Sequence, residues 1–303
     1  MSLLLLGANG QVGFELARSL APLGEVVCAT REAATPEWRV DLADADALIR
    51  ALDRAAPAIV VNAAAYTAVD RAEDEPDLAD RVNHRALAAL GAWAARTRAL
   101  VVHFSTDYVF DGQAARPYRE TDATAPLGVY GRSKLAGEQA LRDSGADHLI
   151  FRTAWVYAAR GHNFLRTMLR LGRERGAVRV VDDQRGAPTP ARLIADVTAH
   201  VLARWQRERR GDRLGTFHLA AAGDCTWCEF AGAIFRRAHA AGLIAQPVAV
   251  TPIATAEFPT RARRPAYSVL DTGKLRAAFG IHLPPWQQGL DMVIGELAAQ
   301  AHG

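Results

Sequence analysis

A tyrosine and a lysine four residues apart could carry out chemistry in this sequence. Tyr130 and Lys134 lie in the segment YGRSK, and their spacing places both on one face of a helix. An ammonium group beside the phenol lowers its pKa from about 10, so Tyr130 could donate a proton near neutral pH. We expect Ser105 or Thr106, in the Ser-Thr-Asp segment that ends at Asp107, to share that hydrogen bond. Because such a pair often lies on an ordinary surface helix, its meaning depends on the other motifs.

A glycine-rich segment follows the apolar run at the N-terminus. Gly7, Gly10 and Gly13 have GxxGxxG spacing, with Gln11 and Val12 between the last two. Glycines let the chain turn tightly and let the backbone approach a pyrophosphate, while the N-terminus of the next helix offers free N–H groups. In this strand–turn–helix context the motif predicts a dinucleotide-binding site.

Residues after the next two expected strands indicate which dinucleotide is bound. An acidic residue after the second strand would bind a ribose 2′-hydroxyl, but the sequence has Thr30 and Arg31. A hydroxyl and a guanidinium suit a 2′-phosphate, so we expect NADPH, with NADH as the alternative. Asp41 and Leu42 end what could be the next strand, and Asp41 could accept from the adenine amino group.

A run of small residues ends the expected fourth strand. Small side chains at a strand end let a dinucleotide lie against the edge of the sheet. The residues assigned to this role, which follow Asn62, are Ala63, Ala64, Ala65 and Tyr66.

Strands and helices must alternate to position these motifs. Apolar runs predict strands buried on both faces at 3–6, 26–29, 58–61, 100–104 and 148–151. Helical periodicity occurs at 12–20, 45–55, 78–97 and 130–144. The alternation predicts an α/β fold with a Rossmann-type doubly wound parallel sheet, whose ligands bind at the carboxyl ends of the strands.

The second half of the chain is less regular. It predicts helices at 163–175, 190–207 and 226–241, and strands at 178–181 and 216–219. We expect residues 1–155, with returning segments of the second half, to form the NADP-binding domain. Residues 156–303 are expected to form mainly a smaller C-terminal α/β part that binds the substrate.

Composition excludes several classes of protein. The 303 residues include 36 Lys and Arg against 33 Asp and Glu, and a net charge of +3 is too balanced for a nucleic-acid-binding protein. We interpret the basic tract 207–213 as a solvated turn. No apolar stretch approaches the roughly 18 residues that span a bilayer, and the N-terminal run lacks the basic segment of a signal peptide. We therefore expect a cytoplasmic protein without membrane contact.

Three cysteines, Cys28, Cys225 and Cys228, are too few for a disulfide framework and fit a reducing compartment. Cys225 and Cys228 form a CxxC motif, but no second pair of zinc ligands accompanies it. We expect no metal there and interpret the motif as the start of a helix, with its role left open.

Nearly the whole sequence resembles the extended short-chain dehydrogenase/reductase family, and within it the group that reduces dTDP-4-dehydrorhamnose. The most specific matches are the blocks VVHFSTDYVFDG at 101–112 and FRTAWVY at 151–157. Further matches are GANGQVG at 7–13, VVNAAAYTAVDRAE at 60–73, YGRSKLAGE at 130–138, NFLRTML at 163–169, DDQRGAPT at 182–189 and RRP at 263–265.

The resemblance implies roles at particular positions. Thr106, Tyr130 and Lys134 match the catalytic triad, and we expect Ser105 and Asp107 beside Thr106 to face the substrate. The positions that match the nucleotide-sugar pocket are Trp155 against the sugar, Asn163 and Phe164 in the pocket wall, and Arg264 at the diphosphate.

The implied reaction is NADPH-dependent reduction of the C4 keto group of a dTDP-linked 4-keto-6-deoxy sugar. The alternatives are another nucleotide-sugar reductase or epimerase, or a non-catalytic NADP-binding regulatory subunit. A dehydratase is disfavoured because Tyr108 stands where a second carboxylate would follow Asp107. The regulatory alternative is disfavoured because Tyr130 and Lys134 are both present.

Metal dependence and oligomeric state differ within this family. Some members form a metal-bridged dimer through acidic residues of the first helix and a later helix. Glu15 is present here, but Arg192 stands where a glutamate is often found. We therefore expect no Mg²⁺, and either a monomer or a homodimer.

Overall fold

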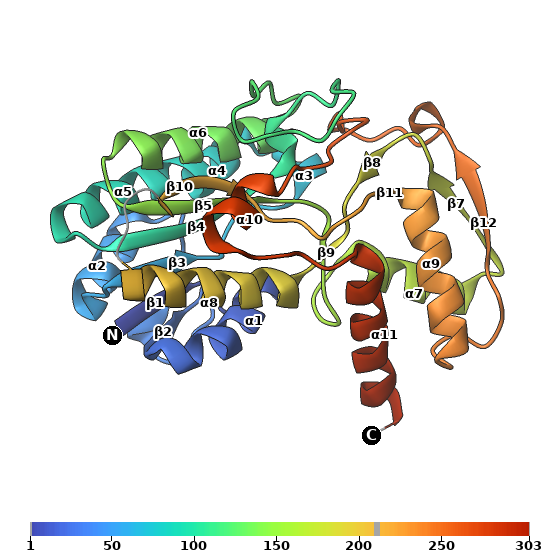
Figure 1. Ribbon diagram of the computed structural model, residues 1–303, viewed down its shortest axis with the longest axis horizontal. Helices are drawn as coiled ribbons and strands as arrows, with labels where there is room; N and C mark the ends of the chain where they lie inside the picture. The colour runs from blue at the N-terminus through green and yellow to red at the C-terminus, as the bar shows by residue number, and fades with distance from the viewer. Residues whose placement is uncertain (1, 209–212, 303) are drawn as a thin grey trace.

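A parallel six-stranded sheet forms the centre of the computed structural model, which describes residues 2–208 and 213–302 (Figure 1). The strands run in the order β10-β5-β4-β3-β1-β2. Their bounds are β1 Ser2–Leu6, β2 Glu25–Ala29, β3 Ile59–Asn62, β4 Leu100–Thr106, β5 His148–Thr153 and β10 Gly215–His218. The order reverses between β1 and β3, where doubly wound sheets bind ligands, and the expected fold class is confirmed.

Helices cover both faces of the sheet because its strand side chains alternate. Leu3 and Leu5 belong to one hydrophobic cluster and Leu4 and Leu6 to another. The first cluster includes helices α1 (Gln11–Leu20), α8 (Ala191–Glu208) and α10 (Gly273–Phe279). The second includes α2 (Ala45–Ala55), α5 (Ala86–Thr97) and α6 (Val129–Asp143). The sheet is thus buried between two helical layers.

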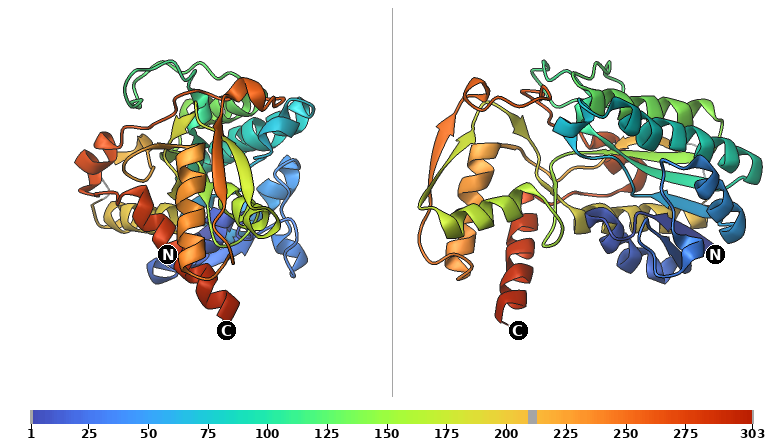
Figure 2. Two further views of the ribbon diagram at one scale, coloured as in Figure 1. Left: turned by 90° about the vertical axis from the view of Figure 1, so that its right-hand side faces the viewer. Right: turned by 180° about the vertical axis from the view of Figure 1, so that it is seen from behind.

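A second lobe has its own hydrophobic cluster beyond the carboxyl ends of the strands (Figure 2). Its main elements are α7 (Phe164–Glu174), α9 (Trp227–Ala240), α11 (Trp286–His302) and the parallel pair of β7 (Ala177–Val181) and β12 (Ala249–Ile253). Short strands connect it to the sheet: β6 (Val156–Tyr157), β8 (Arg185–Gly186), β9 (Thr189–Pro190) and β11 (Cys225–Thr226). Helix α9 begins with a capping box between Thr226 and Glu229.

Two expectations about the first strands were wrong. Residues 40–42 form no strand, since only a single bridge joins Thr30 to Arg39, so the expected fourth and fifth strands are β3 and β4. Strand β2 is not buried on both faces, because it is the edge of the sheet and exposes Glu25 and Cys28. Of the basic tract 207–213, residues 209–212 lie outside the described residues.

The expected helix at 78–97 is interrupted. After the short helices α3 (Val69–Ala72) and α4 (Pro76–Asp80), residues 81–85 form a π-helical turn before α5 begins. This turn brings the Asn83 carbonyl so close to α6 that a Cβ on Gly137 would lie 2.0 Å from it. The backbone of α6 therefore packs directly against the π-helical turn at Gly137. Within residues 2–208 and 213–302, no helix has the length and apolar character of a membrane span.

Candidate active site

The glycine-rich turn lies at the switch point of the sheet. Gly7 has φ +80°, and its N–H donates to the Ala29 carbonyl at 2.8 Å. A Cβ on Gly7 would lie 2.8 Å from the Ala64 nitrogen, and one on Gly13 would lie 2.0 Å from the Gly7 oxygen. Only glycine fits these two positions. The turn itself therefore lies against Ala64, and α1 begins directly after it with Gly10 as its N-cap.

Gln11 connects this turn to the second lobe. Its Oε1 accepts from Asn163 Nδ2 at 2.7 Å, and its Nε2 donates to the His162 carbonyl at 3.4 Å. The Asn163 Oδ1 caps α7 by accepting from the Arg166 N–H. Asn163, which the resemblance places in the sugar pocket, thus uses its side chain as a helix cap and a link between lobes.

The residues expected near the adenosine end lie together at the outer edge of the sheet. Arg31 is exposed, and the Thr30 hydroxyl accepts from the Glu32 N–H at 3.2 Å. Asp41 is also exposed and accepts from the Ala43 N–H at 2.9 Å, whereas Leu42 is buried. An exposed guanidinium beside a hydroxyl remains compatible with a 2′-phosphate.

The segment after β3 lies at the carboxyl end of the sheet, beside the end of β1. The Ala63 N–H donates to the Leu6 carbonyl at 3.0 Å, which fixes this segment beside β1. The Tyr66 hydroxyl donates to Glu75 at 2.6 Å, so its phenol already has a partner within the protein.

Thr106 and Tyr130 meet at the carboxyl end of β4. The nearby Thr106 hydroxyl lowers the pKa of the Tyr130 phenol. The Thr106 hydroxyl also donates to Asp107 at 3.1 Å and accepts from the Tyr108 N–H at 3.1 Å. The Tyr108 ring packs edge-to-face on the Tyr130 ring, with 5.7 Å between centroids. The last residue of β4 and the first turn of α6 thus form one polar cluster.

Burial dominates the acidity of this cluster. It raises the pKa of Tyr130 to about 12, against the Thr106 hydrogen bond, and the Asp107 charge raises it further. Burial likewise raises the pKa of Asp107 to about 6, although hydrogen bonds from Ser268 and Thr106 oppose the change. The expectation that an ammonium lowers the pKa of Tyr130 was therefore wrong for the free protein. Tyr130 keeps its proton at neutral pH.

Lys134 explains this difference because its Nζ is held away from Tyr130 by other partners. The side chain is buried, and Nζ donates to the Phe104 carbonyl at 2.6 Å and lies 3.0 Å from His103 Nε2. Burial lowers the pKa of Lys134 to about 7, although Glu138 opposes the change. Ser105 is buried on the other side of β4, where it lowers the pKa of Glu138 rather than joining Thr106.

Arg264 lies at the cluster but faces an acidic partner. It forms an ion pair with Asp70 at 2.7 Å and a hydrogen bond with Tyr108. Its guanidinium is therefore close to the Tyr108–Tyr130 pair, with Asp70 satisfying part of its charge. Asp70 and Tyr108 were not assigned to the site from the sequence, although both lie within the family-like blocks.

Trp155 lies between the two lobes in a strained conformation. Its φ is +48°, and its ring stacks on Trp227 with 3.4 Å between centroids. Phe164 tilts against Trp227 at 4.6 Å, and a Cβ on Gly186 would lie 2.5 Å from the Trp155 ring. Trp155, Phe164 and Trp227 thus form one aromatic cluster. Trp155 and Phe164 were assigned to the site from the sequence, but Trp227 was not. Its place within the CxxC motif gave no signal of this.

The acidic side chain considered for metal binding has a cation beside it. Glu15 is buried, and its Oε2 lies 3.2 Å from Arg192 Nε and 3.5 Å from Arg18 Nε. No group of three or more His, Cys, Asp or Glu side chains that could hold a metal occurs among the described residues.

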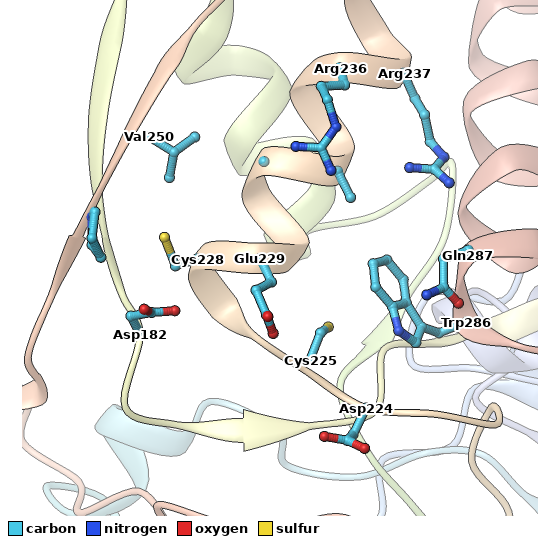
Figure 3. Close-up of a pocket in the computed structure, with 13 residues that line it drawn as sticks. Asp182, Asp224, Cys225, Cys228, Glu229, Arg236, Arg237, Val250, Trp286 and Gln287 are labelled. Atoms are coloured by element: carbon cyan, nitrogen blue, oxygen red, sulfur yellow. The ribbon is translucent and has the colours of Figure 1, made fainter.

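A separate pocket lies in the second lobe beside α9 (Figure 3). Cys225 and Cys228 both line it, and Glu229 lies between them in this view. Both thiols are free. The residues assigned to the candidate active site do not line this pocket.

Comparison with known proteins identifies similar sequences and structures over nearly the whole chain. Residues 1–299 match the family described as RmlD substrate binding domain. The chain is 50% identical to a dTDP-4-dehydrorhamnose reductase of Burkholderia thailandensis, over 99% of this chain and all of that protein. The solved dTDP-4-dehydrorhamnose reductase of Clostridium acetobutylicum is 36% identical with a TM-score of 0.87, over 98% of this chain and 99% of that one. The enzyme of the same name from Bacillus anthracis, solved with NADP, is 33% identical with a TM-score of 0.86, over 97% and 99%.

Proposed function

Since the chain belongs to the RmlD substrate-binding family, together with dTDP-4-dehydrorhamnose reductases, we propose that it is an NADPH-dependent oxidoreductase. Its reaction is reduction of the C4 keto group of dTDP-4-dehydro-L-rhamnose to dTDP-L-rhamnose. The observation that carries this proposal is the contact of Thr106 with a protonated Tyr130 at the carboxyl end of β4.

The residues around the switch point fit the cofactor. The turn is tight because a Cβ at Gly7 or Gly13 would collide with neighbouring backbone. A tight glycine turn before a helix lets the backbone approach a pyrophosphate. Arg31 is exposed at the outer edge, where a 2′-phosphate would accept its hydrogen bonds. When bound, NADPH supplies the hydride. We propose that the sheet and its helices bind NADPH and that the second lobe binds the nucleotide sugar.

Tyr130 is the proposed proton donor. Its raised pKa keeps the phenol protonated until negative charge develops on the substrate oxygen. Thr106 orients the carbonyl by hydrogen bonding to the same oxygen, an electrostatic contribution that grows as the alkoxide forms. Lys134 contributes by binding cofactor hydroxyls once it leaves its buried partners.

A substrate comparison tests the proposal. NADPH absorbance is followed with dTDP-4-keto-6-deoxy-L-mannose and with its UDP and GDP analogues. We expect stoichiometric NADPH consumption with the dTDP sugar, which an epimerase would not show because it returns its cofactor to the starting state. No oxidation of NADPH with any of the three sugars would contradict the proposal.

A further inference from the structure

Three buried side chains form a hydrogen-bonded chain beneath the candidate active site. Asn62 at the end of β3, His103 on β4 and Lys134 on α6 are each only 1% exposed. Asn62 Nδ2 lies 3.2 Å from His103 Nδ1, and His103 Nε2 lies 3.0 Å from Lys134 Nζ. The chain ends where Nζ meets the Phe104 carbonyl at 2.6 Å.

The direction of these hydrogen bonds follows from one backbone contact. The Ala64 N–H donates to Asn62 Oδ1 at 3.1 Å, so the Asn62 amide must present its Nδ2 donor to His103. His103 Nδ1 is therefore an acceptor and carries no proton. Burial lowers the pKa of His103 well below its usual value, so the imidazole is neutral. Its single proton must then lie on Nε2, facing Lys134.

An ammonium cannot accept this proton. If Lys134 were charged, N–H groups of both residues would point at each other across 3.0 Å. A neutral amine resolves the conflict, because its lone pair accepts from His103 Nε2–H while one of its own protons goes to the Phe104 carbonyl.

We propose that Asn62 and His103 are positioning residues that hold Lys134 as a neutral amine in the free protein by selecting the Nε2–H tautomer of His103. The catalytic meaning of this arrangement rests on the proposed function. It accounts for the protonated Tyr130, because a neutral amine has no charge with which to lower the pKa of the phenol.

The other charged groups around Lys134 do not hold it as an ammonium. Glu138, one turn further along α6, is the carboxylate that raises the pKa of Lys134. It is itself paired with Arg152 of β5 at 2.6 Å and with Arg142 at 3.0 Å. His103 faces Lys134 from β4 and is neutral. The direction of the hydrogen bonds and burial both favour the neutral amine.

The lysine content of the chain permits a direct measurement. Lys134 and Lys274 are the only two lysines, so protein labelled with ¹³C-lysine has two side-chain Cε signals. Lys274→Arg assigns them. In the free protein we expect the Lys134 signal to titrate near pH 7. We also expect His103 to show the ¹⁵N pattern of an Nε2–H imidazole, assigned by its loss in His103→Gln.

Two variants at Asn62 test whether its side-chain donor sets the tautomer of His103. In Asn62→Asp the carboxylate accepts from Nδ1–H, so His103 Nε2 becomes an acceptor for an ammonium. We expect the Lys134 transition to rise by about one to three pH units and His103 to change tautomer. Asn62→Ala removes the donor without adding charge, and we expect a smaller rise. The Lys274 transition is the internal control, and circular dichroism establishes that each variant is folded.

The proposal is overturned if His103 carries its proton on Nδ1 in the unchanged protein, or if the Lys134 transition stays in place in both folded variants. These spectra need neither cofactor nor sugar. A protein that shows the expected titrations but no reductase activity would therefore contradict the proposed function and leave this inference standing.

Discussion

At the scale of single residues, the free protein keeps its proposed acid protonated. Burial and the Asp107 charge raise the pKa of Tyr130, and the Thr106 hydrogen bond only partly offsets them. A proton donor must carry its proton when the substrate arrives, so a raised pKa suits reduction. Lys134 does not oppose this state, because its Nζ faces His103 and the Phe104 carbonyl.

Removing the Tyr130 hydroxyl tests its role directly. We expect Tyr130→Phe to lower kcat by on the order of 10²–10⁴, because proton transfer to the sugar oxygen is lost. Cofactor affinity, measured by fluorescence titration with NADPH, should change little. Tyr108→Phe is the matched control and should have a smaller effect. Turnover close to that of the unchanged protein in Tyr130→Phe would exclude this residue as the donor.

Arg31 determines cofactor preference in our interpretation. We expect Arg31→Ala to raise the KM for NADPH by about tenfold, because a charge-assisted hydrogen bond to the 2′-phosphate is lost. The KM for NADH should not change. Arg50→Ala, an exposed arginine on α2, is the control. Equal changes in KM for both cofactors would show that Arg31 does not read the 2′-phosphate.

At the scale of elements, close backbone approach decides where the site lies. Helix α1 can begin directly after β1 only because Gly13 has no side chain above the Gly7 carbonyl. Helix α6 carries Tyr130 against the turn that follows β4 in the same way, since a Cβ on Gly131 would lie 2.3 Å from the backbone carbonyl oxygen of Tyr108. These two contacts set the distance between the expected cofactor turn and the proposed acid.

A pair of glycine variants tests this packing. Gly13→Ala should lower the free energy of unfolding by about 1–3 kcal/mol, because its Cβ would overlap backbone that cannot rotate away. Gly10→Ala should cost less than about 1 kcal/mol, since its Cβ would lie 3.3 Å from the nearest atom. Urea denaturation of both variants measures the difference. Equal midpoints would contradict the close approach at Gly13.

At the scale of the whole molecule, a cluster of buried charged and polar side chains joins α6 to strands β5 and β10. Glu138 of α6 binds Arg152 of β5 through two hydrogen bonds, and both side chains are buried. His218 of β10 lies near them, with Nδ1 3.1 Å from the Asp271 carbonyl. Strand β10 comes from the second half of the chain, so this cluster joins distant segments of the sequence.

The burial of His218 makes stability depend on pH. Burial and the Arg152 charge lower the pKa of His218 to about 3, so the folded protein keeps it neutral where the unfolded chain is protonated. Stability should therefore fall as pH drops from about 6.5 toward 3, by up to about 1.4 kcal/mol per pH unit.

His218→Gln should reduce this acid dependence in urea denaturation between pH 7 and pH 4. The exposed His200→Gln is the control and should behave like the unchanged protein. Parallel pH dependence in His218→Gln and the unchanged protein would contradict the role of His218.

The sequence by itself determined the class of fold and the order of most elements. Alternating apolar runs predicted five strands of the parallel sheet, because a strand buried between helical layers is apolar on both faces. The glycine spacing and the Tyr130–Lys134 spacing also follow from local geometry, and Thr106 lies close enough to Tyr130 to lower the pKa of its phenol.

Only the tertiary structure decided which partner each polar group takes. Asn163 caps a helix, Arg264 pairs with Asp70, and Lys134 turns toward His103. These choices depend on groups brought together from distant parts of the chain and on the burial that makes every hydrogen bond necessary. For the same reason β2 was not recognisable as an edge strand, since its exposure depends on the absence of a neighbour in the described sheet.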